Sequence, residues 1–206
     1  ISNDDRVTIF LDTFNDKRNG YRFEVNPNGI RDDALYLDTT QLQWDWEGIY
    51  YAKADGSHIS EQVFPVEAPN GIGLAPDGNT VYWAETQTGR VMRRTIASPG
   101  VLAAAIPLDT STCMAGLPGY QLLDSLAVDG DGNVCGATLI NGGVTVISPA
   151  DGGMHHIATG DLLTTNICFG DSDGSGEYRD AYITCSGTGR LLHMRWPSPG
   201  LRLNYV

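Results

Sequence analysis

A chain of 206 residues, 41% of them apolar and 18% charged, can bury the core of one domain or of two small ones. Its formal net charge of −12 argues against a role in tracking nucleic acid, because nucleic-acid binders need a basic face to release counterions. We expect no membrane span, because no apolar run reaches the roughly 18 to 20 residues that a membrane helix needs. The opening ISNDDRVTIF also lacks a basic and then apolar leader.

Short apolar and β-branched runs recur along the whole chain, from RVTIFLD near the start to RLLHMRW near the end. They alternate with turn signals such as PDGN, DGDGN, TGR and NGG, in which glycine and asparagine tolerate a positive φ. One stretch, residues 97–123, lacks this rhythm, and we expect a long connection there with one helical turn. The pattern as a whole predicts an all-β fold.

The first part of the chain contains three sequence motifs: DTFND, the expected hairpin YRFEVNPNG and the expected strand WEGIY. Together they resemble part of a family 9 carbohydrate-binding-like β-sandwich found in bacterial surface proteins, over about residues 3–53. The resemblance implies a β-sandwich fragment at residues 1–53 that binds carbohydrate or calcium. Its candidate contacts are Asp12, Asp16, Trp44 and Trp46. Tryptophan packing between sheets is the favoured alternative for the two indoles.

Beyond residue 53 a frame of strand, D-G-N turn, strand, glycine turn and strand occurs twice, in the segments that begin PNGIGLA and LLDSLAV. A looser third copy begins at TTNICFG. Repeats of this size predict propeller blades. The first strand of each blade lines the central channel, so a polar residue at its start points into a shared cavity. Asn70, Asp124 and Asn166 hold these equivalent positions.

Each of these side chains also has an ordinary explanation, since asparagine before glycine is commonly a turn residue and aspartate before a strand is commonly a cap. Their equivalent placement in successive repeats favours a metal or substrate site instead. An amide and a carboxylate are oxygen ligands of the kind that a hard cation takes. A carboxylate beside such an ion can accept a proton from water.

The same three segments are similar to the second half of the senescence marker protein (regucalcin)/gluconolactonase/luciferin-regenerating enzyme family, over about residues 54–206. This resemblance implies the C-terminal blades, about three, of a six-bladed β-propeller that hydrolyses a sugar lactone or a similar small ester with one divalent cation. Carried over, Asn70 is a metal ligand, and Asp124 is both metal ligand and the group that activates water. Asn166 is expected to line the channel and contact substrate.

Two family features are missing from the chain. The remaining protein ligand of the family is a glutamate in an E-G-P stretch, and none of Glu24, Glu47, Glu61 or Glu67 stands in that context. Three blades also cannot close a six-bladed ring, so weak ion binding is expected. An inactive composite and a non-catalytic carbohydrate-binding module therefore stay open as alternatives to a lactone hydrolase. Because both resemblances can claim residues 48–57, a join between two families is expected there.

The expected cation is calcium, with zinc, magnesium and manganese open, because geometry decides preference among oxygen-only sites. The expected partner is a small-molecule lactone, with carbohydrate possible at the N-terminal fragment. The propeller part favours a cytoplasmic location, while the N-terminal part leaves the bacterial envelope or secretion open. The oligomeric state is undetermined, although unpaired blade edges predict self-association.

Three further patterns are expected to be structural. The four cysteines contain no C-x-x-C pair and are expected to be reduced, with Cys135, Cys168 and Cys185 in the core. The stretch DSDGSGE at residues 171–177 is expected to be a solvated turn, because position twelve of an EF-hand loop would fall on Tyr182 in a strand. His155 and His156 should face opposite sides of a strand, and no triad hydrolase is expected.

Overall fold

The computed structural model describes residues 7–11, 20–25, 31–37, 41–44, 48–53, 55–106, 109–171 and 174–202. All regular elements in these ranges are β-strands, apart from one 3-10 turn, as the sequence predicts. The chain divides into two compact units, residues 1–66 and residues 67–206. No helix in the described ranges is long and apolar enough to cross a bilayer.

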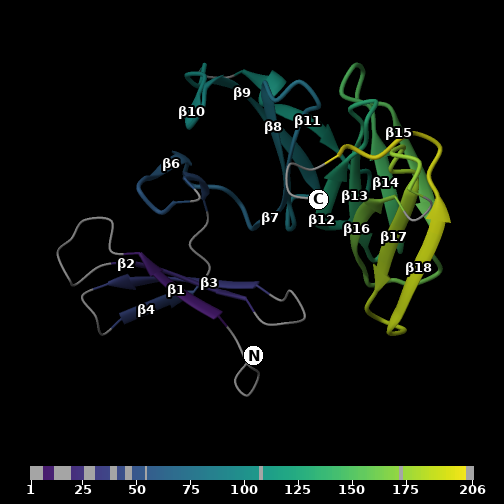
Figure 1. The fold of residues 1–206 in the computed structure, drawn as a ribbon, viewed down its shortest axis with the longest axis horizontal. Coiled ribbons are helices and arrows are strands. Elements are labelled where there is room, and N and C mark those ends of the chain that lie inside the picture. Colours follow the sequence, from purple (N-terminus) through teal and green to yellow (C-terminus); the bar gives the residue numbers. More distant parts are fainter. Residues whose placement is uncertain are drawn as a thin grey trace. The chain divides into compact units, whose positions relative to one another are not determined.

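The first unit contains a four-stranded antiparallel sheet and a separate hairpin (Figure 1). The sheet runs in chain order through β1 (Val7–Leu11), β2 (Gly20–Val25), β3 (Arg31–Leu37) and β4 (Gln41–Trp44). The hairpin pairs β5 (Ile49–Ala52) with β6 (Ile59–Val63). Its turn uses Gly56 at φ 72°, and Asp55 accepts a hydrogen bond from the Ser57 N–H at 2.9 Å.

The sandwich fragment expected at residues 1–53, and the boundary after residue 53, stay predictions. Asp12, Asp16 and Trp46 lie outside the described residues, and so does the side chain of Trp44. The unit boundary falls between Val66 and Glu67, after the β5–β6 hairpin.

The second unit begins with a sheet that we call the first blade. Its strands are β7 (Pro69–Leu74), β8 (Thr80–Glu85), β9 (Arg90–Ser98), the short β10 (Val101–Leu102) and β11 (Cys113–Gly116), which also pairs with β9. The expected helical turn in the long connection is present at Thr110–Thr112, where the Asp109 carboxylate accepts the Ser111 N–H at 2.9 Å. The two short strands β10 and β11 flanking it were not predicted.

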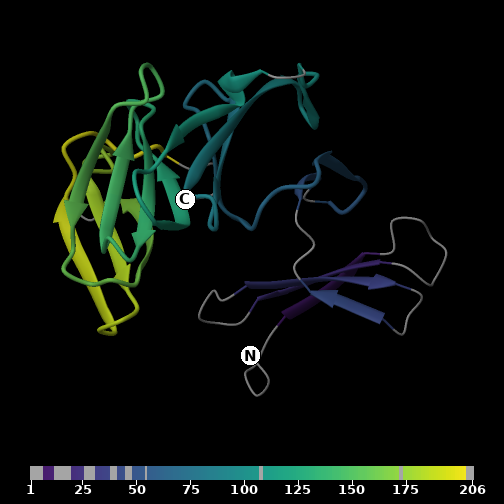
Figure 2. The same ribbon diagram turned by 180° about the vertical axis from the view of Figure 1, so that it is seen from behind.

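Two further sheets follow in chain order. The second blade contains β12 (Leu122–Val128), β13 (Val134–Leu139), β14 (Gly143–Ile147) and β15 (Met154–Ala158). The third blade contains β16 (Thr164–Gly170), β17 (Asp180–Cys185) and β18 (Arg190–Arg195). In both blades each strand pairs antiparallel with the next along the chain. The leading strands of the three blades are neighbours, with β12 against β7 and against β16 (Figures 1 and 2).

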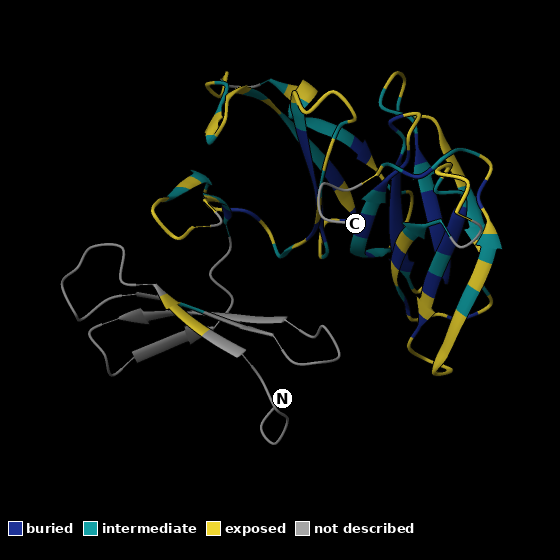
Figure 3. Ribbon diagram, viewed as in Figure 1, coloured by how far each residue is buried: buried dark blue, intermediate teal, exposed yellow. Residues whose placement is uncertain are grey.

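The blades are joined by two apolar layers, because alternate residues of the second blade face opposite neighbours. Figure 3 shows that much of the second blade is buried. In the first seam, between the first and second blades, Tyr82 and Val91 pack with Leu126 and Val134. In the second seam, between the second and third blades, the neighbouring Cys135 packs in a layer with Ile167, Ile183 and Trp196. Strand β13 is therefore buried on both faces, which explains its nearly continuous apolar sequence.

All four cysteines are free, and Cys135 and Cys185 are buried as expected. The expectation is wrong for Cys168, which is exposed. The cause is strand alternation: Ile167 points into the second seam, so the next residue on β16 points to the opposite face.

Candidate functional site

The leading strands β7, β12 and β16 are all irregular at the positions that the sequence singled out. Pairing of β7 with β8 shifts register between Pro69 and Ile72, so Asn70 lies inside the irregular segment. Pairing of β12 with β13 shifts between Leu123 and Leu126, around Asp124. Such bulges turn side chains away from the regular alternation and are common beside active sites.

A glycine lets β7 and β12 approach each other at this point. A Cβ placed on Gly71 would lie 2.3 Å from the Leu126 backbone nitrogen and 2.7 Å from the Ser125 carbonyl carbon. No side chain fits at such distances, because the obstacle is backbone rather than a movable side chain. The P-N-G sequence therefore serves two purposes: asparagine supplies a polar group, and glycine lets its strand reach the neighbouring blade.

The close approach brings Asn70 and Asp124 together. Burial raises the pKa of the half-buried Asp124 carboxyl above its ordinary value of 3.8. Hydrogen bonds from the Ser125 backbone and from the Asn70 side chain act in the opposite direction and lower that pKa. Burial dominates, so Asp124 is a stronger base than an exposed aspartate, and the Asn70 amide is its side-chain partner.

Asn166, the third candidate, is placed differently. It follows the register shift of β16, which falls between Thr164 and Asn166, and its side chain is exposed. Its Oδ1 accepts the backbone N–H of the next residue, Ile167, at 2.8 Å. Among the described residues it forms no hydrogen bond with Asn70 or Asp124, and its role as a channel contact stays a prediction.

The pair Asn70 and Asp124 suits an oxygen-preferring cation in its chemistry. Both groups offer oxygen ligands, and a cation would offset the cost of holding the Asp124 charge in a half-buried position. Within the described ranges, however, no three His, Cys, Asp or Glu side chains gather as a metal-binding group. The chain therefore offers part of a ligand set, and the role of these two residues as ligands stays a prediction.

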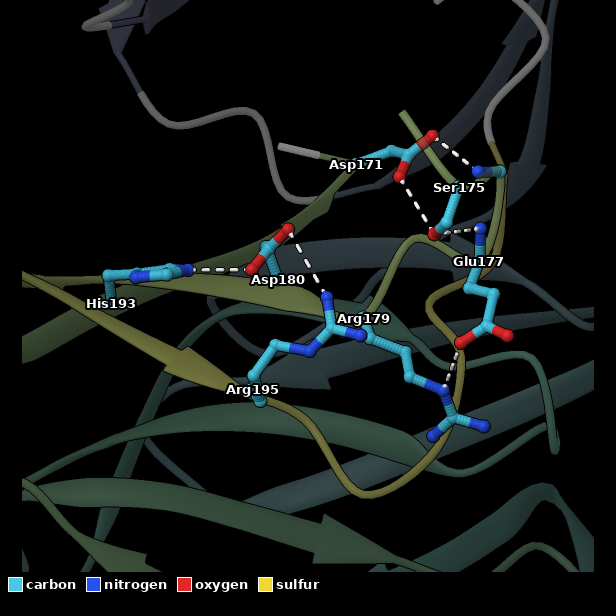
Figure 4. A network of polar contacts seen from close by, with 8 residues as sticks. Asp171, Ser175, Glu177, Arg179, Asp180, His193 and Arg195 are labelled. Atoms are coloured by element: carbon cyan, nitrogen blue, oxygen red, sulfur yellow. Dashed lines mark hydrogen bonds and ion pairs between the residues drawn. The ribbon is translucent and has the colours of Figure 1, made fainter. Parts of the chain in front are cut away.

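A second polar cluster lies on the third blade (Figure 4). The buried Asp180 carboxylate is 2.7 Å from His193 Nε2 and 3.8 Å from Arg195 Nη1, and the His193 ring stacks on Tyr182. These contacts join β17 to β18. Since this histidine is engaged in holding two strands together, the cluster lends no support to a triad hydrolase.

Residues 172 and 173 of the acidic stretch lie outside the described residues, so the turn predicted at 171–177 is described only in part; residues 174–177 are exposed (Figure 4). Asp171 accepts hydrogen bonds from the Ser175 hydroxyl at 3.3 Å and from the Gly176 N–H at 2.7 Å. Tyr182 lies in β17, where an EF-hand would need a glutamate ligand. His155 and His156 also separate as expected, because only His156 reaches Thr145, through Nδ1 at 3.0 Å.

Two contributors to the site escaped sequence reasoning. Ser125 hydrogen-bonds to the Asp124 carboxyl through its backbone, so its side-chain type carries no signal. Gly71 carries a signal, since glycine in a strand marks a bulge or a close backbone approach. Which strand it approaches depends on the packing of the blades, and the chain order alone does not show that.

Solved structures with the same fold share little sequence with the chain. A putative gluconolactonase aligns with a TM-score of 0.62 at 20% identity, covering 88% of this chain and 59% of its own. A gluconolactonase from Xanthomonas campestris aligns with a TM-score of 0.58 at 20% identity, covering 87% and 55%. Regucalcin from Agrobacterium tumefaciens, a calcium-binding protein, aligns with a TM-score of 0.56 at 16% identity, covering 96% and 64%.

These alignments confirm the prediction of a partial β-propeller. They also show that the chain spans only 55% to 64% of the length of the three structures. No curated protein sequence matches the chain. Residues 36–187, however, match the SMP-30/gluconolactonase/LRE-like region, and this match starts before the expected boundary at residue 53. Because it covers well over half of the sequence, the chain belongs to the SMP-30/gluconolactonase/LRE-like family.

Proposed function

We propose that the chain hydrolyses a small lactone or a similar ester at the Asn70–Asp124 pair. The observation that carries this proposal is the meeting of these two side chains on adjacent leading strands, made by the close approach at Gly71. Membership of a family that includes gluconolactonases supports lactone hydrolysis as the reaction class.

In this proposal Asp124 is the base. Its carboxylate accepts a proton from water as the water oxygen attacks the lactone carbonyl, and burial makes it a better acceptor than an exposed aspartate. The ring C–O bond then breaks, and Asp124 passes this proton to the leaving oxygen, giving one hydroxyl group and one carboxylic acid, which releases the second proton of the water to solvent as it ionises. Asn70 holds the carboxylate in place through its side-chain hydrogen bond.

We further propose that Asn70 and Asp124 hold a divalent cation, calcium first, with zinc, magnesium and manganese as the other candidates. Such a cation would polarise the carbonyl and acidify the attacking water. Two protein oxygen ligands leave most positions of a calcium ion to water, so weak affinity is expected. Regucalcin, one of the similar structures, is named as a calcium-binding protein, which supports the choice of calcium.

The test is lactone hydrolysis by the full chain, followed as acid release, with and without added calcium or zinc. Asp124→Asn should lower turnover by at least about a hundredfold, which is the usual loss when a general base is removed. Asp131→Asn, in the exposed D-G-N turn at the far end of β12, is the matched control and should keep full activity.

Equal turnover in the two variants would contradict the role of Asp124. Calcium binding without any turnover in the parent chain would instead support the inactive composite. Binding of carbohydrate by residues 1–53 remains the other alternative, since its candidate side chains lie outside the described residues.

A further inference from the structure

The first blade contains a cavity of about 400 Å³ that does not include Asn70 or Asp124. It is bounded by β8, by β9 and by the connection that follows β10. Its charged lining residues are Arg93, Arg94 and Asp109. The volume lies within the range of about 300 to 1,000 Å³ that is usual for small-molecule sites. We call it the Arg93 cavity.

Arg93 is held in position by uncharged groups. Its Nε donates to the Ser111 carbonyl oxygen at 3.0 Å, and its Nη1 donates to the Pro149 carbonyl oxygen, on the second blade, at 3.1 Å. A guanidinium has five N–H donors, and among the described residues these two bonds use two of them. The arginine is therefore fixed in place while its charge and several donors stay available to a ligand.

The charges around the cavity suit a singly charged anion. Arg94 also lines it and donates to the Ala103 carbonyl oxygen. Hydrogen bonds from Ser111 lower the pKa of the Asp109 carboxyl, and the charges of Arg93 and Arg94 lower it further. With Asp109 ionised, these three side chains carry one net positive charge, in a chain whose formal net charge is −12.

The rest of the cavity lining is rich in hydroxyl groups. They belong to Thr80, Tyr82, Thr95, Ser111 and Thr112. Tyr82 is only 4% exposed, and burial raises the pKa of its phenol, so it stays a neutral hydroxyl at pH 7. Hydroxyls both donate and accept hydrogen bonds, which matches a ligand that itself carries several hydroxyl groups.

We propose that the Arg93 cavity binds a small hydroxycarboxylate. Arg93 engages the carboxylate with its remaining N–H donors, and the surrounding hydroxyls bind those of the ligand. Opening of a sugar lactone releases a molecule of this class, so the cavity would bind the product of the proposed reaction. Binding there does not require turnover, and the cavity is assayed apart from the Asn70–Asp124 pair.

The experiment is calorimetric titration of the full chain with gluconate, in the presence of EDTA so that no cation bridges ligand and protein. We expect saturable binding that Arg93→Gln weakens at least about tenfold, as expected for a lost charge-assisted pair. Arg190→Gln, which removes an equal charge from the exposed start of β18, is the matched control and should bind like the parent. Asp124→Asn should also bind like the parent, even if it abolishes hydrolysis.

A second variant guards against misfolding of Arg93→Gln. Thr95→Val removes one hydroxyl from an exposed position of the lining and should weaken gluconate about threefold while leaving the fold intact. Sorbitol, which has the hydroxyls without the charge, should bind at least about tenfold more weakly. The proposal is overturned if gluconate binding does not saturate, or if Arg93→Gln and Arg190→Gln weaken gluconate binding equally. It is also overturned if Asp124→Asn abolishes gluconate binding, or if sorbitol or inorganic phosphate binds more tightly than gluconate.

Discussion

The two seams between blades differ in how their leading strands meet. In the first seam the residue after the polar candidate is Gly71, and β7 reaches the backbone of β12. In the second seam the equivalent residue is Ile167, which is 2% exposed and fills the apolar layer with its side chain. Asn70 consequently contacts Asp124, whereas the Asn166 side chain accepts a hydrogen bond from the backbone N–H of the next residue. The comparison indicates that the residue beside a polar candidate decides whether that candidate joins a site.

Adding one methyl group at Gly71 should have the largest effect. In Gly71→Ala the new Cβ would lie 2.3 Å from the Leu126 nitrogen, so the strands must separate. We expect the free energy of unfolding to fall by about 3 kcal/mol, the upper end of ordinary overpacking costs. Lactone turnover should be lost with it. Urea denaturation and the acid-release assay measure the two effects.

Gly116→Ala is the control for this substitution. Gly116 is also in a strand of the first blade, but its nearest obstacle is the flexible Arg90 side chain at 3.9 Å. The free energy of unfolding of Gly116→Ala should equal that of the parent or exceed it by about 0.5 kcal/mol. Similar losses in both variants would show that any Cβ in this blade is destabilising, and the comparison of the seams would fail.

Removing a methyl group from the second seam should reduce stability less than Gly71→Ala does and should leave lactone turnover unchanged. Ile167→Val removes one methyl group from a closed apolar layer and should lower the free energy of unfolding by about 1 kcal/mol. Because Ile167 packs in the apolar layer of the second seam and Asn70 meets Asp124 at the first, we expect lactone turnover measured below the unfolding range to equal that of the parent. A change in turnover would show that both seams shape the site.

Much of this fold could be predicted from local signals, and the site only in part. Strand alternation and glycine turns are local, so the strands of the three blades lie where the sequence placed them, except the short β10 and β11 in the long connection. Asn70 and Asp124 were found because their motifs repeat. The bulges, the approach of Gly71 to β12 and the exposure of Cys168 depend on which strand or blade lies opposite. The Arg93 cavity forms where residues of the connection after β10 lie beside β8 and β9, and no local sequence pattern predicts that arrangement.

The segment that joins the second blade to the third carries a buried carboxylate, Asp161. Asp161 precedes β16 and accepts the Leu163 N–H at 2.8 Å, the Thr188 N–H at 2.7 Å and the Thr188 hydroxyl. The adjoining Leu163 bridges to Leu139 of the second blade. These hydrogen bonds hold the pKa of Asp161 below its ordinary value of 3.8, and the bond from the Thr188 side chain has the largest effect.

Acid should therefore loosen these contacts. A carboxyl whose pKa is lowered by folding stabilises the protein fully above the unfolded pKa, and the contribution is lost as pH falls through the folded value. The midpoint of urea unfolding should thus decline below about pH 4. Asp161→Asn should flatten part of that decline, whereas Asp151→Asn, in an exposed turn, should flatten it less. Identical slopes in all three proteins would remove Asp161 from the explanation.

The smallest effect is expected at Asn166. Its side chain is exposed, and the hydrogen bond that it accepts comes from the backbone of the next residue, Ile167. Asn166→Ala should therefore change the free energy of unfolding by less than about 0.5 kcal/mol. Asn70→Ala is the informative partner, because it removes the side chain that contacts Asp124. If proximity to Asp124 decides function, Asn70→Ala should lower lactone turnover far more than Asn166→Ala. Equal losses would mean that substrate itself bridges the second seam, and Asn166 would then be the channel contact that its position in the repeat predicts.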